Sequence, residues 1–112
     1  MRMMMQFSIP VEAGNRAACA GSFGPTFQTV LEALKPEAAY FVAEGGKRTC
    51  YLFVNIQDAS EIPSIAEPFF LALNAEVAIT PAMNAQDLAN AGPSIEKAAK
   101  KYGAAAQSAA AR

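Results

Sequence analysis

Three polar residues on expected strands, Tyr40, Tyr51 and Asn55, are the first candidates for binding a ligand. We expect them close together on one face of a sheet, because alternate residues of a strand share a face. An asparagine within an apolar strand needs hydrogen-bond partners, and small-molecule sites combine an apolar cavity with a few polar groups. These residues could therefore orient a small ligand. The simpler interpretation, which we prefer, is a structural hydrogen bond at a subunit interface.

Two charged residues, Arg16 and Glu67, are further candidates. Glu67 precedes Pro68, and a kinked helix could aim its carboxylate inward, where burial would raise its pKa. A solvated position on the helix surface is the more common fate of a glutamate. Arg16 could bind an acidic ligand, or it could pair with Glu12 on the surface, where an ion pair contributes little.

The chain lacks residue types that many catalytic and metal-binding sites use. There is no histidine, the usual general base near neutral pH and the commonest ligand of zinc and haem iron. Cys19 and Cys50 form no Cys-x-x-Cys motif, and we expect both to be buried, reduced thiols in a cytoplasmic protein. The sequence thus identifies no catalytic residue, and it predicts neither a metal site nor a cofactor.

The formal net charge of −1 gives no positive field that would collect phosphates, so neither nucleic acid nor an anionic membrane is an expected partner. RNA-recognition motifs share the predicted strand and helix order, and Tyr51 and Phe53 fit their aromatic consensus loosely. Cys50, however, replaces the consensus glycine, and the basic residue is out of register. No segment approaches the length of a membrane span.

The candidate residues are positioned by alternating strands and helices. Residues 1–9 alternate with the period of a strand, and Gly45-Gly46 is a tight-turn dipeptide that predicts an antiparallel hairpin. The four expected strands are Met1–Ile9, Ala38–Glu44, Arg48–Ile56 and Glu76–Thr80.

Between these strands the apolar residues recur every three or four positions, which predicts helices. Residues 14–34 predict either one helix kinked near Gly24 or two shorter ones. A second region begins at the cap residue Asp58 and stops at Asn74, with a kink expected at Pro68. Beyond the fourth strand, Asn84 caps a final helical region that Gly92-Pro93 breaks.

The last predicted helix, Ser94 to Tyr102, ends at Gly103, and residues 104–112 are expected to be a disordered tail. Residues 1–103 then form one α+β domain of ferredoxin-like βαββαβ build, with a four-stranded antiparallel sheet and an extra C-terminal helix.

Both faces of the expected sheet are apolar, which predicts a homodimer. Cys50, Leu52 and Val54 form one face of the third strand, whereas Tyr51 and Phe53 keep the other largely apolar. Helices would cover one face, and the other would be too large an apolar patch for a monomer. A second copy related by a two-fold axis would cover it. The alternative is that the C-terminal helix folds back over this face.

In four short segments the sequence resembles small bacterial proteins of the dimeric α/β-barrel superfamily. They lie at residues 7–10, 34–41, 66–70 and 92–103, within a resemblance that covers residues 1–103. The superfamily includes cofactor-free monooxygenases, lactone isomerases, haem-handling enzymes and ligand-sensing domains, and fold alone does not choose among them. Few acid–base residues lie on the expected strands, which slightly favours a homodimeric domain that binds a small ligand or a partner protein without turnover. The alternative is a cofactor-independent enzyme, monooxygenase- or isomerase-like, acting on a small apolar or aromatic substrate.

Overall fold

The computed structural model describes residues 1–110 of the chain, with side chains described for residues 1–105. The chain divides into two compact units, Met1–Ala82 and Met83–Arg112. The first unit contains the complete sheet and its covering helices, and the second contains the C-terminal helices. Each unit is described by itself.

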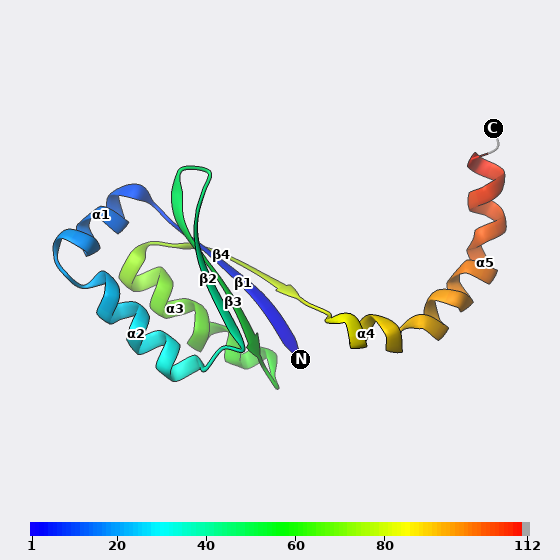
Figure 1. The fold of residues 1–112 in the computed structure, drawn as a ribbon, viewed down its shortest axis with the longest axis horizontal. Helices are drawn as coiled ribbons and strands as arrows, with labels where there is room; N and C mark the ends of the chain where they lie inside the picture. Colours follow the sequence, from blue (N-terminus) through cyan, green and yellow to red (C-terminus); the bar gives the residue numbers. More distant parts are fainter. Residues whose placement is uncertain (111–112) are drawn as a thin grey trace. The chain divides into compact units, whose positions relative to one another are not determined.

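The first unit is an α+β fold around one four-stranded antiparallel sheet (Figure 1). The strand order is β2-β3-β1-β4. The hairpin strands β2 and β3 lie next to each other at one edge of the sheet, and helices make the crossover connections. The strands are β1 (Arg2–Ile9), β2 (Ala38–Glu44), β3 (Lys47–Asn55) and β4 (Glu76–Pro81). The helices are α1 (Val11–Cys19), α2 (Phe23–Leu34) and α3 (Ile62–Leu73), the last preceded by the 3₁₀ turn η1 (Ala59–Glu61). This confirms the predicted α+β class and antiparallel sheet, and the arrangement is consistent with a ferredoxin-like fold.

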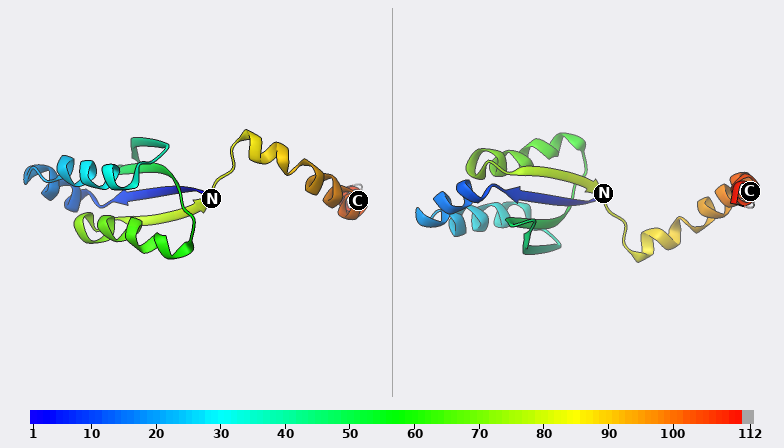
Figure 2. Two further views of the ribbon diagram at one scale, coloured as in Figure 1. Left: turned by 90° about the horizontal axis from the view of Figure 1, so that it is seen from below. Right: turned by 90° about the horizontal axis from the view of Figure 1, so that it is seen from above.

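The core lies between one face of the sheet and the helices. Met3, Met5, Phe7 and Ile9 alternate along β1 and are at most 5% exposed, as the period of two in the sequence predicts. Phe7 stacks on Phe69 of α3, with ring centroids 3.7 Å apart. We refer to this side of the sheet as the helix face and to the other as the open face. Figure 2 shows the helices and strands of this unit from two further directions.

The β2–β3 hairpin turns on two residues, Gly45 and Gly46, with φ angles of +60° and +76°. Positive φ at both central positions defines the turn whose twist matches that of paired strands, and glycine adopts it without steric cost. The predicted hairpin is therefore confirmed. Its register places Tyr40 directly opposite Tyr51 and Phe41 opposite Cys50.

Of the two alternatives for residues 14–34, the structure has two helices, α1 and α2. The break is at Gly21, whose φ is +72°. Pro25 falls in the first turn of α2, where a missing N–H breaks no helical hydrogen bond, so it causes no interior kink. In contrast, α3 continues through Pro68 and ends at Asn74, which adopts the predicted left-handed conformation.

The prediction that both cysteines are buried is wrong for Cys19, which is exposed, and right for Cys50. The buried residues of α1 are Ala13, Gly14 and Ala17. A residue two positions beyond Ala17 lies on nearly the opposite side of the helix, so Cys19 faces away from the core. Neither cysteine forms a disulfide.

The C-terminal unit contains α4 (Ala85–Asn90) and α5 (Gly92–Ala110). Asn84 caps the start of α4 as predicted, and Asp87 completes a reciprocal capping box with it. The predicted helix end at Gly103 is wrong, because α5 continues to Ala110. An interior glycine costs only about 1 kcal/mol, and the alanine-rich stretch after it strongly favours helix. Residues 104–110 are thus helical, and the rest of the predicted tail, 111–112, lies outside the described residues. Within residues 1–110, no helix is both long and apolar enough to cross a membrane.

Candidate functional site

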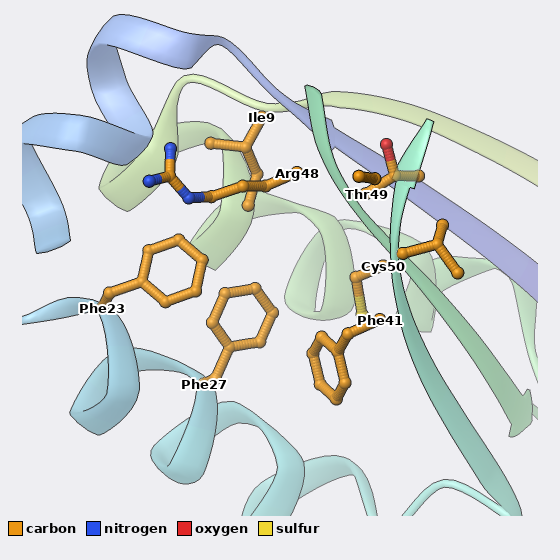
Figure 3. Close-up of a pocket in the computed structure, with 9 residues that line it drawn as sticks. Ile9, Phe23, Phe27, Phe41, Arg48, Thr49 and Cys50 are labelled. Atoms are coloured by element: carbon orange, nitrogen blue, oxygen red, sulfur yellow. The ribbon is translucent and has the colours of Figure 1, made fainter. Parts of the chain in front are cut away.

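An apolar cavity of about 310 Å³ lies on the helix face of the hairpin (Figure 3). Its wall combines residues from β1, α2, β2 and β3, so it exists only when helix and hairpin are packed together. The lining residues are Ile9, Phe23, Phe27, Phe41, Val42, Ala43, Arg48, Thr49 and Cys50. We call this space the aromatic cavity.

Three phenylalanines give the cavity its shape. The Phe27 ring lies 5.0 Å from that of Phe23, one turn earlier in α2, and meets Phe41 of β2 edge to face at 5.3 Å. Phe27 also contacts Phe69 of the core at 5.7 Å. Aromatic pairs in such tilted arrangements gain about 1 kcal/mol beyond the area they bury. The wall is therefore anchored to the core through Phe27, whereas Phe41 is 55% exposed and leaves the cavity accessible.

Arg48 is the only charged residue of the cavity lining. Its guanidinium lies over the Phe23 ring, 5.7 Å from the centroid, and Nη1 donates to Oδ1 of Asn15 at 3.1 Å. Figure 3 shows the guanidinium beside Phe23, with the rest of the side chain close to Ile9. The cavity is thus apolar inside, with one oriented cation at its edge.

The thiol of Cys50 also lines the cavity but has little nucleophilic character. It is 1% exposed, and desolvation by burial raises its pKa to about 12. Only the thiolate attacks electrophiles readily. At neutral pH Cys50 is therefore a small apolar wall residue.

The candidate residues Tyr40 and Tyr51 lie side by side on the open face of the sheet. The Tyr51 hydroxyl donates to Glu44, and its oxygen lies 2.7 Å from Oε1 and 2.9 Å from Oε2. Nε2 of Gln6 donates to the same carboxylate at 2.7 Å. This hydrogen bond to Glu44 raises the pKa of Tyr51 above its ordinary value, with partial desolvation and the negative charge of Glu44 acting in the same direction.

Asn55 also lies on the open face, but its side chain binds the N-terminus of the chain rather than the two tyrosines. The Met1 amino group donates to its Oδ1 at 2.7 Å. Asn55 is exposed, so the premise of a buried asparagine is wrong. Tyr40 and Tyr51 are neighbours as predicted, and Asn55 is separate from the Tyr51–Glu44–Gln6 group.

Arg16 and Glu67 lie away from both features. Arg16 is exposed on α1, beside a shallow polar depression that includes Ser22 and Asn74. Within residues 1–105 it makes no ion pair with Glu12; the ion pair found there joins Arg2 and Glu37. Glu67 is exposed on α3, in agreement with the simpler interpretation.

The sequence did not point to the aromatic cavity. Helical spacing predicts that Phe23 and Phe27 lie on the apolar face of a helix, and both contact the core. The missed signal is that Phe41 and Arg48, on either side of the two-glycine turn, lie on the same face of the hairpin as the buried Cys50. Within the described residues, no group of three histidine, cysteine, aspartate or glutamate side chains is placed to hold a metal ion.

Comparison of the chain with protein-family models and with curated proteins finds no match.

Proposed function

We propose that this chain is a ferredoxin-like, homodimeric domain that binds a small apolar or aromatic molecule in the aromatic cavity. The observation that carries the proposal is the cavity itself, about 310 Å³ and walled by Phe23, Phe27 and Phe41. This volume lies in the range of small-molecule sites, which are mostly apolar with a few polar groups. The two free thiols fit a reducing compartment, and we place the protein in the cytoplasm.

The open face of the sheet supports the dimer. Its central rows, read across the paired strands, are Ala38–Phe53–Met4–Thr80 and Tyr40–Tyr51–Gln6–Ala78. Tyr40 is 61% exposed and Val42, further along the same strand, is 43% exposed. Exposed apolar surface of this kind is stabilised by association.

A second copy of the same face is the occupant that we propose, because two of the charged residues on this face, Arg2 and Glu44, already have side-chain partners in the chain. Arg2 is paired with Glu37 at one end, and Glu44 accepts hydrogen bonds from Tyr51 and Gln6 at the other. Two such faces can meet in a self-complementary contact around a two-fold axis.

Binding without turnover accounts for the cavity better than catalysis does. Arg48 and Cys50 are the ionisable residues of its lining, and neither is a proton acceptor near neutral pH. General acid–base catalysis needs a group with a pKa near the working pH within hydrogen-bond reach of the substrate. A cofactor-independent enzyme stays the alternative, and it would have to use the Tyr51–Glu44 pair on the open face.

An NMR titration with 3-phenylpropionate, which has an aromatic ring and a short chain, tests the proposed site. We expect chemical-shift changes centred on Phe27, Phe41 and Cys50. Ala43→Leu places a larger side chain in the cavity wall and should abolish these changes. Ala33→Leu, at an exposed position of α2, is the matched control and should leave them intact. Shifts centred on the open face, or unchanged binding by Ala43→Leu, would overturn the assignment.

A further inference from the structure

Arg48 is held in place as a binding group would be. Three separate features fix its guanidinium: the Phe23 ring, the Asn15 side chain and the surface of α1 at Gly14. A long side chain ordinarily loses rotamer freedom when it is fixed in one place, which opposes binding. The rotamer of Arg48 is already restricted by these contacts before a ligand binds, so binding should cost less of this freedom.

Gly14 makes this arrangement possible. A Cβ atom at Gly14 would lie 2.6 Å from Nη1 of Arg48, closer than real Cβ atoms approach, and 3.3 Å from its Cδ, a tight contact. Gly14 has ordinary helical geometry within α1, so no unusual φ angle accounts for glycine there. The missing side chain gives the guanidinium its space against the helix.

The positive charge of Arg48 has no acidic partner among the side chains that the structure describes. Among residues 1–105, no carboxylate lies within ion-pairing distance of its guanidinium. Its side-chain hydrogen bond uses Nη1 alone, with the neutral Asn15 as acceptor. A guanidinium carries five N–H donors in a planar fork, so donors are left over for a planar oxyanion.

We propose that the ligand of the aromatic cavity is a monocarboxylate with an apolar or aromatic body, and that Arg48 binds its carboxylate. This inference rests on the proposed function and names its ligand class. The apolar wall takes the body of the molecule, and the charge stays at the edge, beside Arg48. A single arginine balances one negative charge, which favours a carboxylate over a dianionic phosphate.

Two probes of nearly the same shape test the inference: 3-phenylpropionate, which is anionic, and 3-phenylpropionamide, which is neutral. Dissociation constants for both are measured by NMR titration. For the wild-type protein we expect the carboxylate to bind about fivefold more tightly, a modest preference because Arg48 is exposed and solvent screens the interaction.

The Arg48→Gln variant should bind the two probes with equal affinity, because the carboxylate loses its charged partner. Lys47→Gln, which removes the neighbouring positive charge of the same hairpin, is the matched control and should keep the preference. Gly14→Ala should keep the fold and weaken the preference, because the guanidinium must leave its place.

The outcomes separate the two proposals. If the wild-type protein binds neither probe, the proposed function fails and this inference fails with it. If both probes bind equally at the cavity, or if Arg48→Gln keeps the preference for the carboxylate, the ligand class is wrong while the binding site stands.

Discussion

Tyr51 and Glu44 form a hydrogen-bonded pair on the open face of the sheet, with the phenol oxygen 2.7 Å and 2.9 Å from the two carboxylate oxygens. The pair joins the middle of β3 to the end of β2. Because Gln6 of β1 donates to the same carboxylate, the group spans three strands. It gives this face a fixed polar group beside Tyr40.

The first prediction concerns the titration of Tyr51. Its pKa is raised by the bond to Glu44, so the neutral phenol is favoured in the folded protein. The resulting stabilisation is fully present below the unfolded-state pKa of about 10 and is lost as the pH rises through the higher folded-state value. The difference between absorbance titrations of wild type and Tyr51→Phe isolates this group and should show a midpoint above 10. Glu44→Gln should move that midpoint down, and an unchanged midpoint would show that the pair does not form in solution.

The second prediction distinguishes the two cysteines. Cys19 is exposed, whereas Cys50 is buried with a pKa raised to about 12. At pH 8 only about 10⁻⁴ of a thiol with that pKa is ionised, and only the thiolate alkylates readily. Iodoacetamide should therefore label Cys19 in the folded protein, and Cys50 only after unfolding. Peptide mass spectrometry gives the site of labelling, and equal rates at both cysteines would contradict the packing of β3.

The third prediction tests the stack between Phe7 and Phe69, whose ring centroids are 3.7 Å apart. Phe69 is 1% exposed, so Phe69→Ala should lower the free energy of unfolding by about 3–5 kcal/mol through lost burial and the cavity left behind. Phe70, the next residue of α3, is 42% exposed, and Phe70→Ala should cost less than about 1 kcal/mol. Urea denaturation of both variants measures the difference, and similar losses would mean that α3 packs in another orientation.

The fourth prediction compares two glycines. Gly46 has a φ of +76°, and Gly46→Ala should cost about 1–2 kcal/mol because Cβ is strained in that conformation. Gly24 lies in α2 with nothing within 4 Å of an added Cβ, so Gly24→Ala should leave stability unchanged or raise it by up to about 1 kcal/mol. Thermal unfolding of the two variants measures both effects. If Gly46→Ala left the stability unchanged, the tight turn would be ruled out.

Features that depend on short stretches of sequence were predictable. The alternation of β1 gave the buried set Met3, Met5, Phe7 and Ile9, and the two glycines gave the hairpin and hence the pairing of Tyr40 with Tyr51. Such features follow from local stereochemistry, which nearby residues determine. The end of α5 was missed because a single glycine is a weak stop within an alanine-rich run.

The aromatic cavity was not predictable in the same way. Its wall joins Phe23 of α2, Phe41 of β2 and Arg48 of β3, whose proximity depends on how the helix packs on the hairpin. Helical spacing assigns Phe23 and Phe27 to a buried face but does not show that space is left beside them. Asn55 illustrates the reverse error, because an apolar strand suggested burial at a strand end that is exposed.

Two variants test whether the open face is the dimer interface. Tyr40 is 61% exposed on that face, and Tyr40→Lys should dissociate the proposed dimer, since each copy would bury a lysine charge in place of aromatic surface. Leu71 is 80% exposed on α3, on the opposite layer, and Leu71→Lys is the matched control. Size-exclusion chromatography with light scattering should give a monomer for the first variant and a dimer for the second. A dimeric Tyr40→Lys variant would place the interface elsewhere.

Native mass spectrometry of the full-length protein, with and without 3-phenylpropionate, tests the central claim of a ligand-binding homodimer most directly. We predict the mass of two subunits without the ligand, and added mass for up to one ligand in each subunit with it. A protein that stays a single subunit and gains no mass from the ligand would contradict both the paired open faces and the aromatic cavity as a binding site.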